Sequence, residues 1–271
     1  PLLPHMHSKN GPGISVADVN GDGLEDFYVG GASGHNGALF LQNAESKFSR
    51  GSLAGIDSLS EDMGVLFFDA DGDSDMDLYI ASGGSDHTKD SPLYKDHLYL
   101  NDGSGKFIYS ATALPDIRQS GSSVVGADYD RDGDVDLFVG GRIIPGEYPM
   151  PADSYILRND SRKNDCKFTD VTAELAPGLL KLGLVTSALW TDVDNDGWVD
   201  LLLVGEFMPI TCYKNNVGKT FTPINKEGFA HTSGWWNSLV AGDFDNDGDT
   251  DYVAGNLGLN SRYKGNTKEP V

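Results

Sequence analysis

A nine-residue acidic segment that occurs five times constrains this chain more than any other feature. In each copy, side chains with oxygen atoms stand at positions one, three, five and nine of the segment. Position six is Gly23, Gly133, Gly197 or Gly248 in four copies and Ser74 in the second copy. One such segment would pass for an ordinary acidic turn, but five copies in register identify a repeat protein. The oxygen-bearing side chains are Asp18, Asn20, Asp22 and Asp26; Asp69, Asp71, Asp73 and Asp77; Asp128, Asp130, Asp132 and Asp136; Asp192, Asp194, Asp196 and Asp200; and Asp243, Asp245, Asp247 and Asp251.

This spacing is typical of a calcium loop. Ca²⁺ takes about six to eight oxygen ligands, and alternate residues of a tightly curled loop direct their carboxylates to one centre. A residue at position six that tolerates a left-handed backbone permits a sharp turn, and this turn brings the side chain of position nine back to that centre. Position seven then offers its main-chain carbonyl, so its side chain varies: Leu24, Asp75, Asp134, Trp198 and Asp249. We therefore predict about five structural Ca²⁺ ions; Mg²⁺ resists full dehydration by protein ligands and fits less well.

The loop is not that of an EF-hand. An EF-hand needs a bidentate glutamate at position twelve and a helix on each side. Position twelve is here occupied by Val29, Ile80, Val139, Leu203 and Ala254, none of which can ligate. Short apolar runs of strand type precede and follow each acidic segment. The segment is therefore predicted to be the turn of a β-hairpin.

The residues between the acidic segments follow a shared plan. A glycine-rich turn leads to a third strand-like run that ends near Asn43, Asn101, Asn159 or Asn215, and a fourth run contains Phe48, Phe107, Phe168 or Phe221. Four strands in roughly 50–60 residues form one blade of a β-propeller. We predict an all-β fold, a single partial propeller over residues 1–271, with four complete blades and part of a fifth. The expected blades are 14–62, 63–121, 122–184, 185–236 and 237–271, the last incomplete.

With these motifs, the chain resembles the FG-GAP/VCBS blades of integrin α-subunit propellers, whose calcium lies in the first hairpin of a blade. Segments such as 205–209, 234–237 and 255–260 are also similar to the large VCBS-repeat surface proteins of Bacteroidetes, which are related to the cartilage acidic protein family. This resemblance implies a fragment of a seven-bladed propeller within a longer polypeptide. It also implies an extracellular or outer-membrane surface location.

The charge of the chain bears on its partners. There are 41 acidic and 20 basic residues, a formal net charge of −21. A chain this acidic repels phosphate backbones, so nucleic acid is excluded as a partner. The sequence has no apolar run of about 18 residues, so we expect no transmembrane segment in this chain.

If the calcium loops occupy one face of the propeller, the other loops gather on the opposite face, where a rigid scaffold commonly carries its binding residues. Aromatic, amide and charged side chains there suit a sugar, and the alternative is that they pack between blades or tie down loops. These candidate ligand-binding residues are Arg142, Tyr148, Glu206, Trp235, Trp236, Asn237, Asn256 and Asn260.

The leading functional hypothesis is a calcium-stabilised binding or adhesion module that recognises a glycan or a protein, and we expect no enzyme because no catalytic constellation is visible. The alternatives are a propeller-type lyase or dehydratase and a purely architectural segment. His35 and His87 would be the residues of an enzymatic site, whereas His5 and His7 are expected to be solvated. Cys166 and Cys212 either form a disulfide or remain free thiols.

Overall fold

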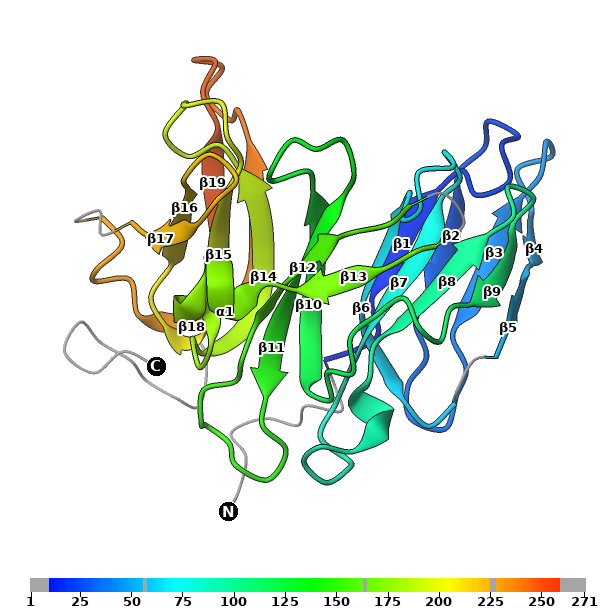
Figure 1. The fold of residues 1–271 in the computed structure, drawn as a ribbon, viewed down its shortest axis with the longest axis horizontal. Coiled ribbons are helices and arrows are strands. Elements are labelled where there is room, and N and C mark those ends of the chain that lie inside the picture. Colours follow the sequence, from blue (N-terminus) through cyan, green and yellow to red (C-terminus); the bar gives the residue numbers. More distant parts are fainter. Residues whose placement is uncertain (1–9, 56–57, 163–164, 225–227, 259–271) are drawn as a thin grey trace.

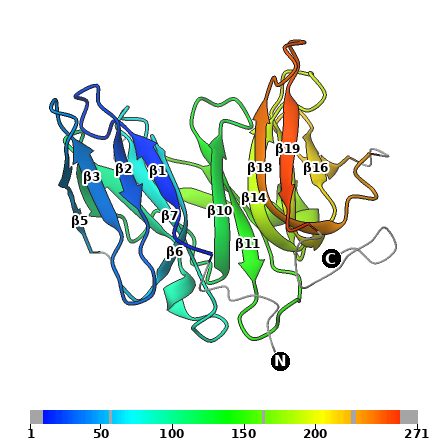
Figure 2. The same ribbon diagram turned by 180° about the vertical axis from the view of Figure 1, so that it is seen from behind.

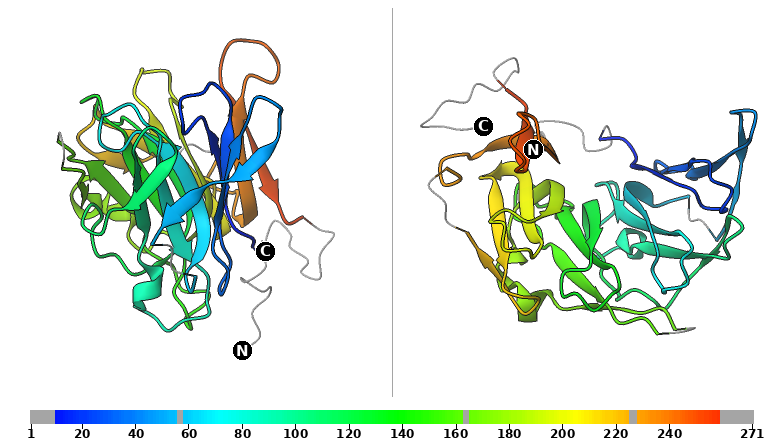
Figure 3. Two further views of the ribbon diagram at one scale, coloured as in Figure 1. Left: turned by 90° about the vertical axis from the view of Figure 1, so that its right-hand side faces the viewer. Right: turned by 90° about the horizontal axis from the view of Figure 1, so that it is seen from above.

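The computed structural model describes residues 10–55, 58–162, 165–224 and 228–258. Antiparallel sheets follow one another along the chain and stand side by side in an open arc (Figures 1 and 2). Seen from above, the sheets surround a common axis (Figure 3). In this part of the chain no helix is both long enough and apolar enough to cross a membrane.

The first two sheets contain the first two acidic segments. One has the order β1-β2-β3-β4 and the other the order β5-β9-β8-β7-β6. β5 follows β4 directly but pairs parallel with β9, so it attaches the first sheet to the outer edge of the second. The strands are β1 (Ile14–Ala17), β2 (Asp26–Val29), β3 (Ala38–Gln42), β4 (Phe48–Arg50), β5 (Ser52–Ala54), β6 (Glu61–Phe68), β7 (Asp77–Gly83), β8 (His97–Asn101) and β9 (Lys106–Tyr109), with the 3₁₀ turn η2 (Pro92–Tyr94) between β7 and β8.

The remaining three acidic segments lie in the second half of the chain. The third sheet has the order β10-β11-β12-β13, and β14 to β17 form the fourth in the same manner. The hairpin β18–β19 joins the fourth sheet through the pairs Glu206–Trp235 and Met208–Gly234. The elements are β10 (Ser120–Ala127), β11 (Asp136–Ile143), β12 (Tyr155–Asn159), β13 (Phe168–Asp170), α1 (Thr172–Leu175), η3 (Pro177–Leu179), β14 (Leu184–Thr191), β15 (Asp200–Met208), β16 (Thr211–Asn215), β17 (Phe221–Pro223), β18 (Gly234–Gly242) and β19 (Asp251–Asn256).

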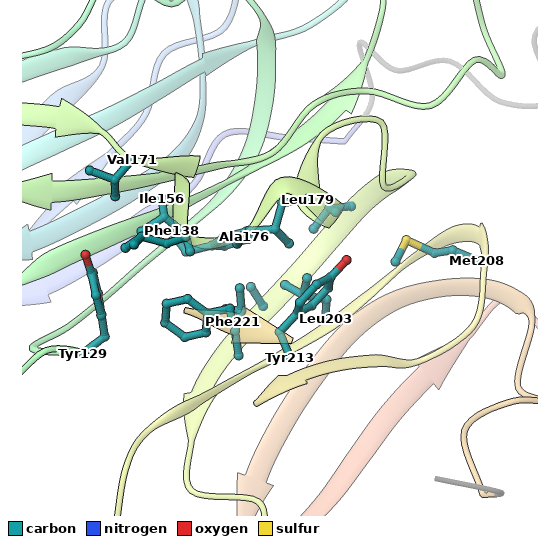
Figure 4. Close-up of a cluster of buried hydrophobic side chains, with 14 residues drawn as sticks. Tyr129, Phe138, Ile156, Val171, Ala176, Leu179, Leu203, Met208, Tyr213 and Phe221 are labelled. Carbon is teal, nitrogen blue, oxygen red and sulfur yellow. The ribbon is translucent and has the colours of Figure 1, made fainter. Parts of the chain in front are cut away.

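The hydrophobic core lies between neighbouring sheets. Figure 4 shows the cluster between the third and fourth sheets, where Tyr129, Phe138, Leu203 and Phe221 are all buried. Side chains alternate along each strand, so both faces of an inner sheet can be apolar and each can pack on a neighbour. Phe48, at the outer edge of the first sheet, is 49% exposed.

The fold class expected from the repeats is confirmed: the described residues form an all-β propeller fragment whose repeats are units of antiparallel strands, with β5 added to the second sheet and β18–β19 added to the fourth. Each acidic segment is the turn of the first hairpin in its sheet, and the β18–β19 hairpin carries the fifth. The turns that join β1 to β2, β10 to β11, β14 to β15 and β18 to β19 lie at the same edge of the molecule, at the top of Figure 1. The loops that follow the second strand of each first hairpin, and those that lead into its first strand, therefore lie at the opposite edge of the molecule.

Candidate functional site

Each acidic segment is shaped by its first aspartate. The main-chain N–H of position six donates to that carboxylate in all five copies, for example Gly23 to Asp18 at 2.8 Å and Gly197 to Asp192 at 2.7 Å. Position six has a positive φ throughout, which explains the glycine. Ser74 adopts the same conformation with φ 76°. The curled loop predicted from the spacing is therefore present even where glycine is replaced.

The aspartate at position nine anchors the loop to its sheet. Asp77 is buried, and its two oxygens accept the main-chain N–H groups of Ala70 and Asn101, both at 2.8 Å. The same pair of bonds recurs in the first, third and fourth segments, at Asp26, Asp136 and Asp200. Because one bond comes from position two and the other from the third strand, this carboxylate fixes the loop against β3, β8, β12 or β16.

Three carboxylates converge in four of the five loops. The residues at positions one, three and nine each offer an oxygen, and these oxygens lie within 4.8 Å of one another. In the first segment position three is Asn20, so the carboxylates at these positions are only Asp18 and Asp26. The converging sets are Asp69, Asp71 and Asp77; Asp128, Asp130 and Asp136; Asp192, Asp194 and Asp200; and Asp243, Asp245 and Asp251.

The donor set fits a hard cation. Oδ1 of Asp71 and Oδ1 of Asp130, both at position three, are buried and have no hydrogen-bond partner. A buried carboxylate oxygen without a partner is costly, and a metal ion would provide the missing interaction. Burial raises the pKa of Asp77 to about 7 and that of Asp136 to about 8, and neighbouring aspartates add to both shifts. A divalent cation would favour the ionised forms and reverse these shifts.

Position five differs from the other predicted ligand positions. Its aspartate accepts the main-chain N–H of position seven in all five segments, as Asp73 does from Asp75 at 2.9 Å. It stands outside the converging sets. At position seven, Trp198 stacks its ring under the guanidinium of Arg131, whose carbon lies 4.1 Å from the ring centroid. Arg131 belongs to the third loop, so this contact joins two neighbouring loops.

Lys214 is a residue of the fourth loop that the sequence reasoning missed. Its ammonium contacts Asp194 and lies 2.6 Å from Asp196. The hydrogen bond from Lys214 lowers the pKa of Asp196. The sequence does contain a signal for this residue. Lys214 stands directly before the recurrent asparagine at the end of the third strand of its repeat, and the equivalent residue of the second repeat is the uncharged Leu100. The fourth segment thus already holds one positive charge beside its carboxylates.

On the opposite face, three of the candidate ligand residues form a connected group, in which Arg142 and Glu206 are buried and Tyr148 is half-buried. Arg142 on β11 makes an ion pair with Glu206 on β15, and both side chains are buried. The hydroxyl of Tyr148 donates to Oε2 of Glu206 at 3.1 Å. These contacts join the third sheet to the fourth. They agree with the alternative that these residues pack between blades.

The tryptophans and asparagines divide between interior and surface. Trp235 is buried, with its ring 5.4 Å from that of Phe207. Trp236 is half-buried and donates from Nε1 to the carbonyl of Thr232 at 2.8 Å. Asn237 and Asn256 are exposed, whereas Asn260 lies outside the described residues. Among these candidate ligand residues, the exposed ones are thus Asn237 and Asn256, whose side chains carry amide groups.

The same face carries a cavity of about 400 Å³ beside the second and third sheets. Its wall combines cations and carboxylates in a chain that is otherwise strongly acidic, and the charged residues are Lys89, Asp90, Asp116, Arg118, Asp153 and Lys181. The guanidinium of Arg118 is paired with Asp116 at 2.7 Å. A mixed, concave surface of this kind is suited to a polar ligand.

The two histidines considered for an enzymatic site, His35 and His87, lie in the turns that follow β2 and β7. His35 is exposed, and Nε2 of His87 lies 3.2 Å from the carbonyl oxygen of Leu59. Cys166 and Cys212 do not form a disulfide with one another, and burial raises the pKa of the Cys166 thiol to about 11. His5 and His7 lie outside the described residues.

Comparison with known proteins identifies the repeats. The family model described as FG-GAP-like repeat matches residues 18–80, 81–139 and 192–254. Cartilage acidic protein 1 of Xenopus tropicalis is 26% identical over 193 residues, which cover 69% of this chain and 28% of that protein. The Mus musculus protein of the same name is 25% identical over 223 residues, which cover 80% of this chain and 32% of that protein. The chain spans about a third of the length of these curated relatives. The similarity to VCBS-repeat surface proteins of Bacteroidetes stays a prediction.

Proposed function

The chain belongs to the FG-GAP-like repeat family, and from this premise we propose that it is a calcium-stabilised extracellular binding module. In this proposal, Ca²⁺ ions hold the acidic loops on one face of the propeller. The opposite face recognises a glycan or a protein. The observation that carries the proposal is the convergence of carboxylates in four loops, two of which contain buried oxygens without partners.

The proposed calcium ligands are those expected from the spacing. Side chains at positions one, three, five and nine supply oxygens, and position seven supplies its main-chain carbonyl. The first loop would bind its ion with the side-chain oxygen of Asn20 in place of one carboxylate. In the fourth loop, the ion would compete with the ammonium group of Lys214 for the carboxylates. An ion in each loop would offset the repulsion among its aspartates and lock the turn that position nine ties to the sheet.

An extracellular location agrees with the relatives and with the chemistry. The chain is similar to cartilage acidic protein 1 of three vertebrates. Loops of moderate affinity stay filled where calcium is abundant, as it is for extracellular modules that bind with dissociation constants of about 10⁻⁴–10⁻³ M. We propose the same setting for this chain, including display on a cell surface.

The ligand is proposed to bind at the face opposite the acidic loops because that face has the concave polar surface. The 400 Å³ cavity and the exposed Asn237 and Asn256 lie there. The scaffold below is rigid, since every inner sheet packs on a neighbour. Surface loops on such a scaffold are the usual location of recognition residues.

The test is a thermal-shift and binding screen of the chain in saturating Ca²⁺ against a glycan panel and a panel of extracellular matrix proteins. Arg142 and Trp235 are buried, so their substitution would disturb folding; the informative changes are Asn237→Ala, Asn256→Ala and Lys181→Ala. Binding that is saturable and weakened by these changes supports the proposal. If neither panel contains a ligand that depends on this face, the binding function is wrong.

A further inference from the structure

The inner strands of the propeller share an irregularity at one level. The strand pairing slips between Asp62 and Gly64 on β6, and one-residue slips at the same level occur on β14 and β18. On β10 the slip at this level is longer, from Gly121 to Val124. Each slip contains the residue six positions before the first aspartate of its acidic segment: Met63, Ser122, Thr186 and Asn237. A β-bulge re-aims a side chain and is common beside functional sites. Four repeats thus redirect equivalent side chains.

All four of these residues line one cavity of about 280 Å³. Arg142 and the segment 10–12, which leads into β1, complete the lining. Because the first and the fifth repeat both border it, the cavity lies at the axis that the sheets surround (Figure 3). Its volume is near the lower end of the range of about 300–1,000 Å³ that small-ligand sites occupy.

The two hydroxyl groups in the wall present lone pairs. Ser122 Oγ donates to the carbonyl of Val185 at 2.7 Å, and Thr186 Oγ1 donates to the carbonyl of Trp236 at 2.9 Å. A hydroxyl has one proton to donate and two acceptor lone pairs. Since each proton is already used to join one repeat to the next, these side chains can only accept hydrogen bonds from a ligand.

The wall also contains an unsatisfied donor. Arg142 is 5% exposed, its Nη2 is committed to Glu206, and its Nη1 has no hydrogen-bond partner. A buried guanidinium donor without an acceptor is costly, so this position calls for an oxygen of a ligand or of water. The charge of Arg142 is balanced by Glu206, and the group therefore donates without providing net attraction for an anion.

We propose that the axial cavity binds a neutral, hydroxyl-rich unit, a single uncharged sugar ring. This rests on the proposed binding function and names the chemistry of its ligand. In this site, sugar hydroxyls donate hydrogen bonds to Ser122 and Thr186 and accept one from Arg142. The amide of Asn237 can both donate and accept. Met63 packs against a C–H face of the sugar ring.

An acidic sugar or a free carboxylate fits this wall poorly. The lone pairs of Ser122 and Thr186 would face its negative charge, and Glu206 already neutralises Arg142. The net charge of −21 also repels anions at longer range. The hydrogen-bonding character of the wall, more than its size, thus decides the ligand class.

The test uses the chain in saturating Ca²⁺ and saturation-transfer NMR with D-galactose, D-mannose, N-acetyl-D-glucosamine, D-galacturonate and D-glucuronate. We expect at least one neutral sugar to bind and both uronates to bind more weakly. Met63→Phe fills the cavity and should abolish binding. Asn237→Ala, at an exposed position, should weaken binding about fivefold to tenfold through loss of a hydrogen bond. Thr222→Val, at an exposed position of β17, is the control and should leave binding unchanged, with the melting temperature of each variant recorded.

Three outcomes would overturn the inference. The first is binding of a neutral sugar that is the same in wild type, Met63→Phe and Asn237→Ala. The second is a preference for uronates, and the third is no binding of any monosaccharide. If a larger glycan or a protein still binds through Lys181 or Asn256, the proposed function stands and only the axial site is wrong. If nothing binds at all, both are wrong.

Discussion

The side-chain amide of Asn215 donates a hydrogen bond to the main-chain carbonyl of Tyr129, 2.8 Å away in the preceding sheet. Asn159 makes the equivalent bond to Ala70 at 3.1 Å, and Asn101 makes it to Val19 at 2.7 Å. The acceptor is always position two of the preceding acidic segment. Its N–H is held by the position-nine aspartate, so Asn101, Asn159 and Asn215 each tie their own sheet to the acidic segment of the sheet before it.

The first prediction concerns this bond. Asn215→Ala removes donors to Tyr129 and Val199 and the acceptor for the N–H of Gly218, all in a fully buried position. Buried groups left without partners cost about 1–3 kcal/mol each, so we expect the free energy of unfolding to fall by about 3 kcal/mol. Urea denaturation in saturating Ca²⁺ measures it.

Asn216→Ala is the matched control for Asn215→Ala. The Asn216 side chain bonds only within its own turn, to Thr220 and Thr222 at the surface. We expect a loss below about 1 kcal/mol. Equal losses for the two variants would contradict the role assigned to the recurrent asparagine.

The second prediction is that chelation destabilises the chain strongly. A site filled at 100 times its dissociation constant contributes about 2.7 kcal/mol, and about 1 kcal/mol shifts the melting temperature of a chain of this size by roughly 2–4 °C. With several sites, EDTA should lower the melting temperature by more than about 10 °C, and Ca²⁺ should restore it better than Mg²⁺. Differential scanning calorimetry checks this; an unchanged transition after exhaustive chelation means that calcium is not structural.

The third prediction assigns a single loop. Asp130→Ala removes the position-three side-chain oxygens, one of which is buried without a partner, and should reduce the calcium stoichiometry by one. Asp86→Ala, at an exposed residue outside the acidic segments, should keep the wild-type stoichiometry. Isothermal titration calorimetry distinguishes the two variants. Full stoichiometry in Asp130→Ala would remove this residue from the ligand set.

The fourth prediction uses the ion pair in the fourth loop. Lys214→Met removes the cation that lies 2.6 Å from Asp196, so the loop should bind metal about threefold to tenfold more tightly. Trp198 is in the same loop, and its sensitised Tb³⁺ luminescence reports on this site. Lys219→Met, on the exposed turn before β17, should leave the Tb³⁺ affinity unchanged. A weaker or unchanged affinity in Lys214→Met would show that the lysine does not compete with the metal.

The fifth prediction is a pH dependence from Asp96. Burial raises the pKa of Asp96 to about 7, although its oxygens accept from the Tyr79 hydroxyl and the Ser82 N–H. The unfolded chain has the lower pKa of about 3.9, so the unfolded state releases this proton first and the contribution to stability falls between about pH 4 and pH 7. Asp96→Asn keeps both bonding partners without the charge.

The stability of Asp96→Asn relative to wild type should therefore rise as the pH increases from 5 to 8. Urea denaturation of both proteins at the two pH values gives this difference, and titration of the other carboxylates cancels because both proteins share it. A difference that is constant with pH would mean that Asp96 is ionised throughout.

Much of the fold was predictable because the repeat is explicit in the sequence. Asp18, Asp69, Asp128, Asp192 and Asp243 mark the first hairpins, and the runs after them predicted the further strands of the repeats. The parallel pairing of β5 with β9 and the pairing of β18 with β15 were not predicted. The burial of Arg142, Glu206 and Trp235 was not predictable, since a long polar or aromatic side chain at a strand end can face solvent or a neighbouring sheet. The signal for Lys214 was present but weak: one cation before a recurrent asparagine.

The sequence by itself determined the loop chemistry, the hairpins and the propeller class, because these depend on residues within about ten positions of one another and on their repetition. Only the tertiary structure decided what the recurrent asparagines bond, which charges are buried between sheets, and which side chains reach the axis. Those relationships join residues such as Asn215 and Tyr129, 86 positions apart. They depend on how one sheet packs against the next, which no local pattern specifies.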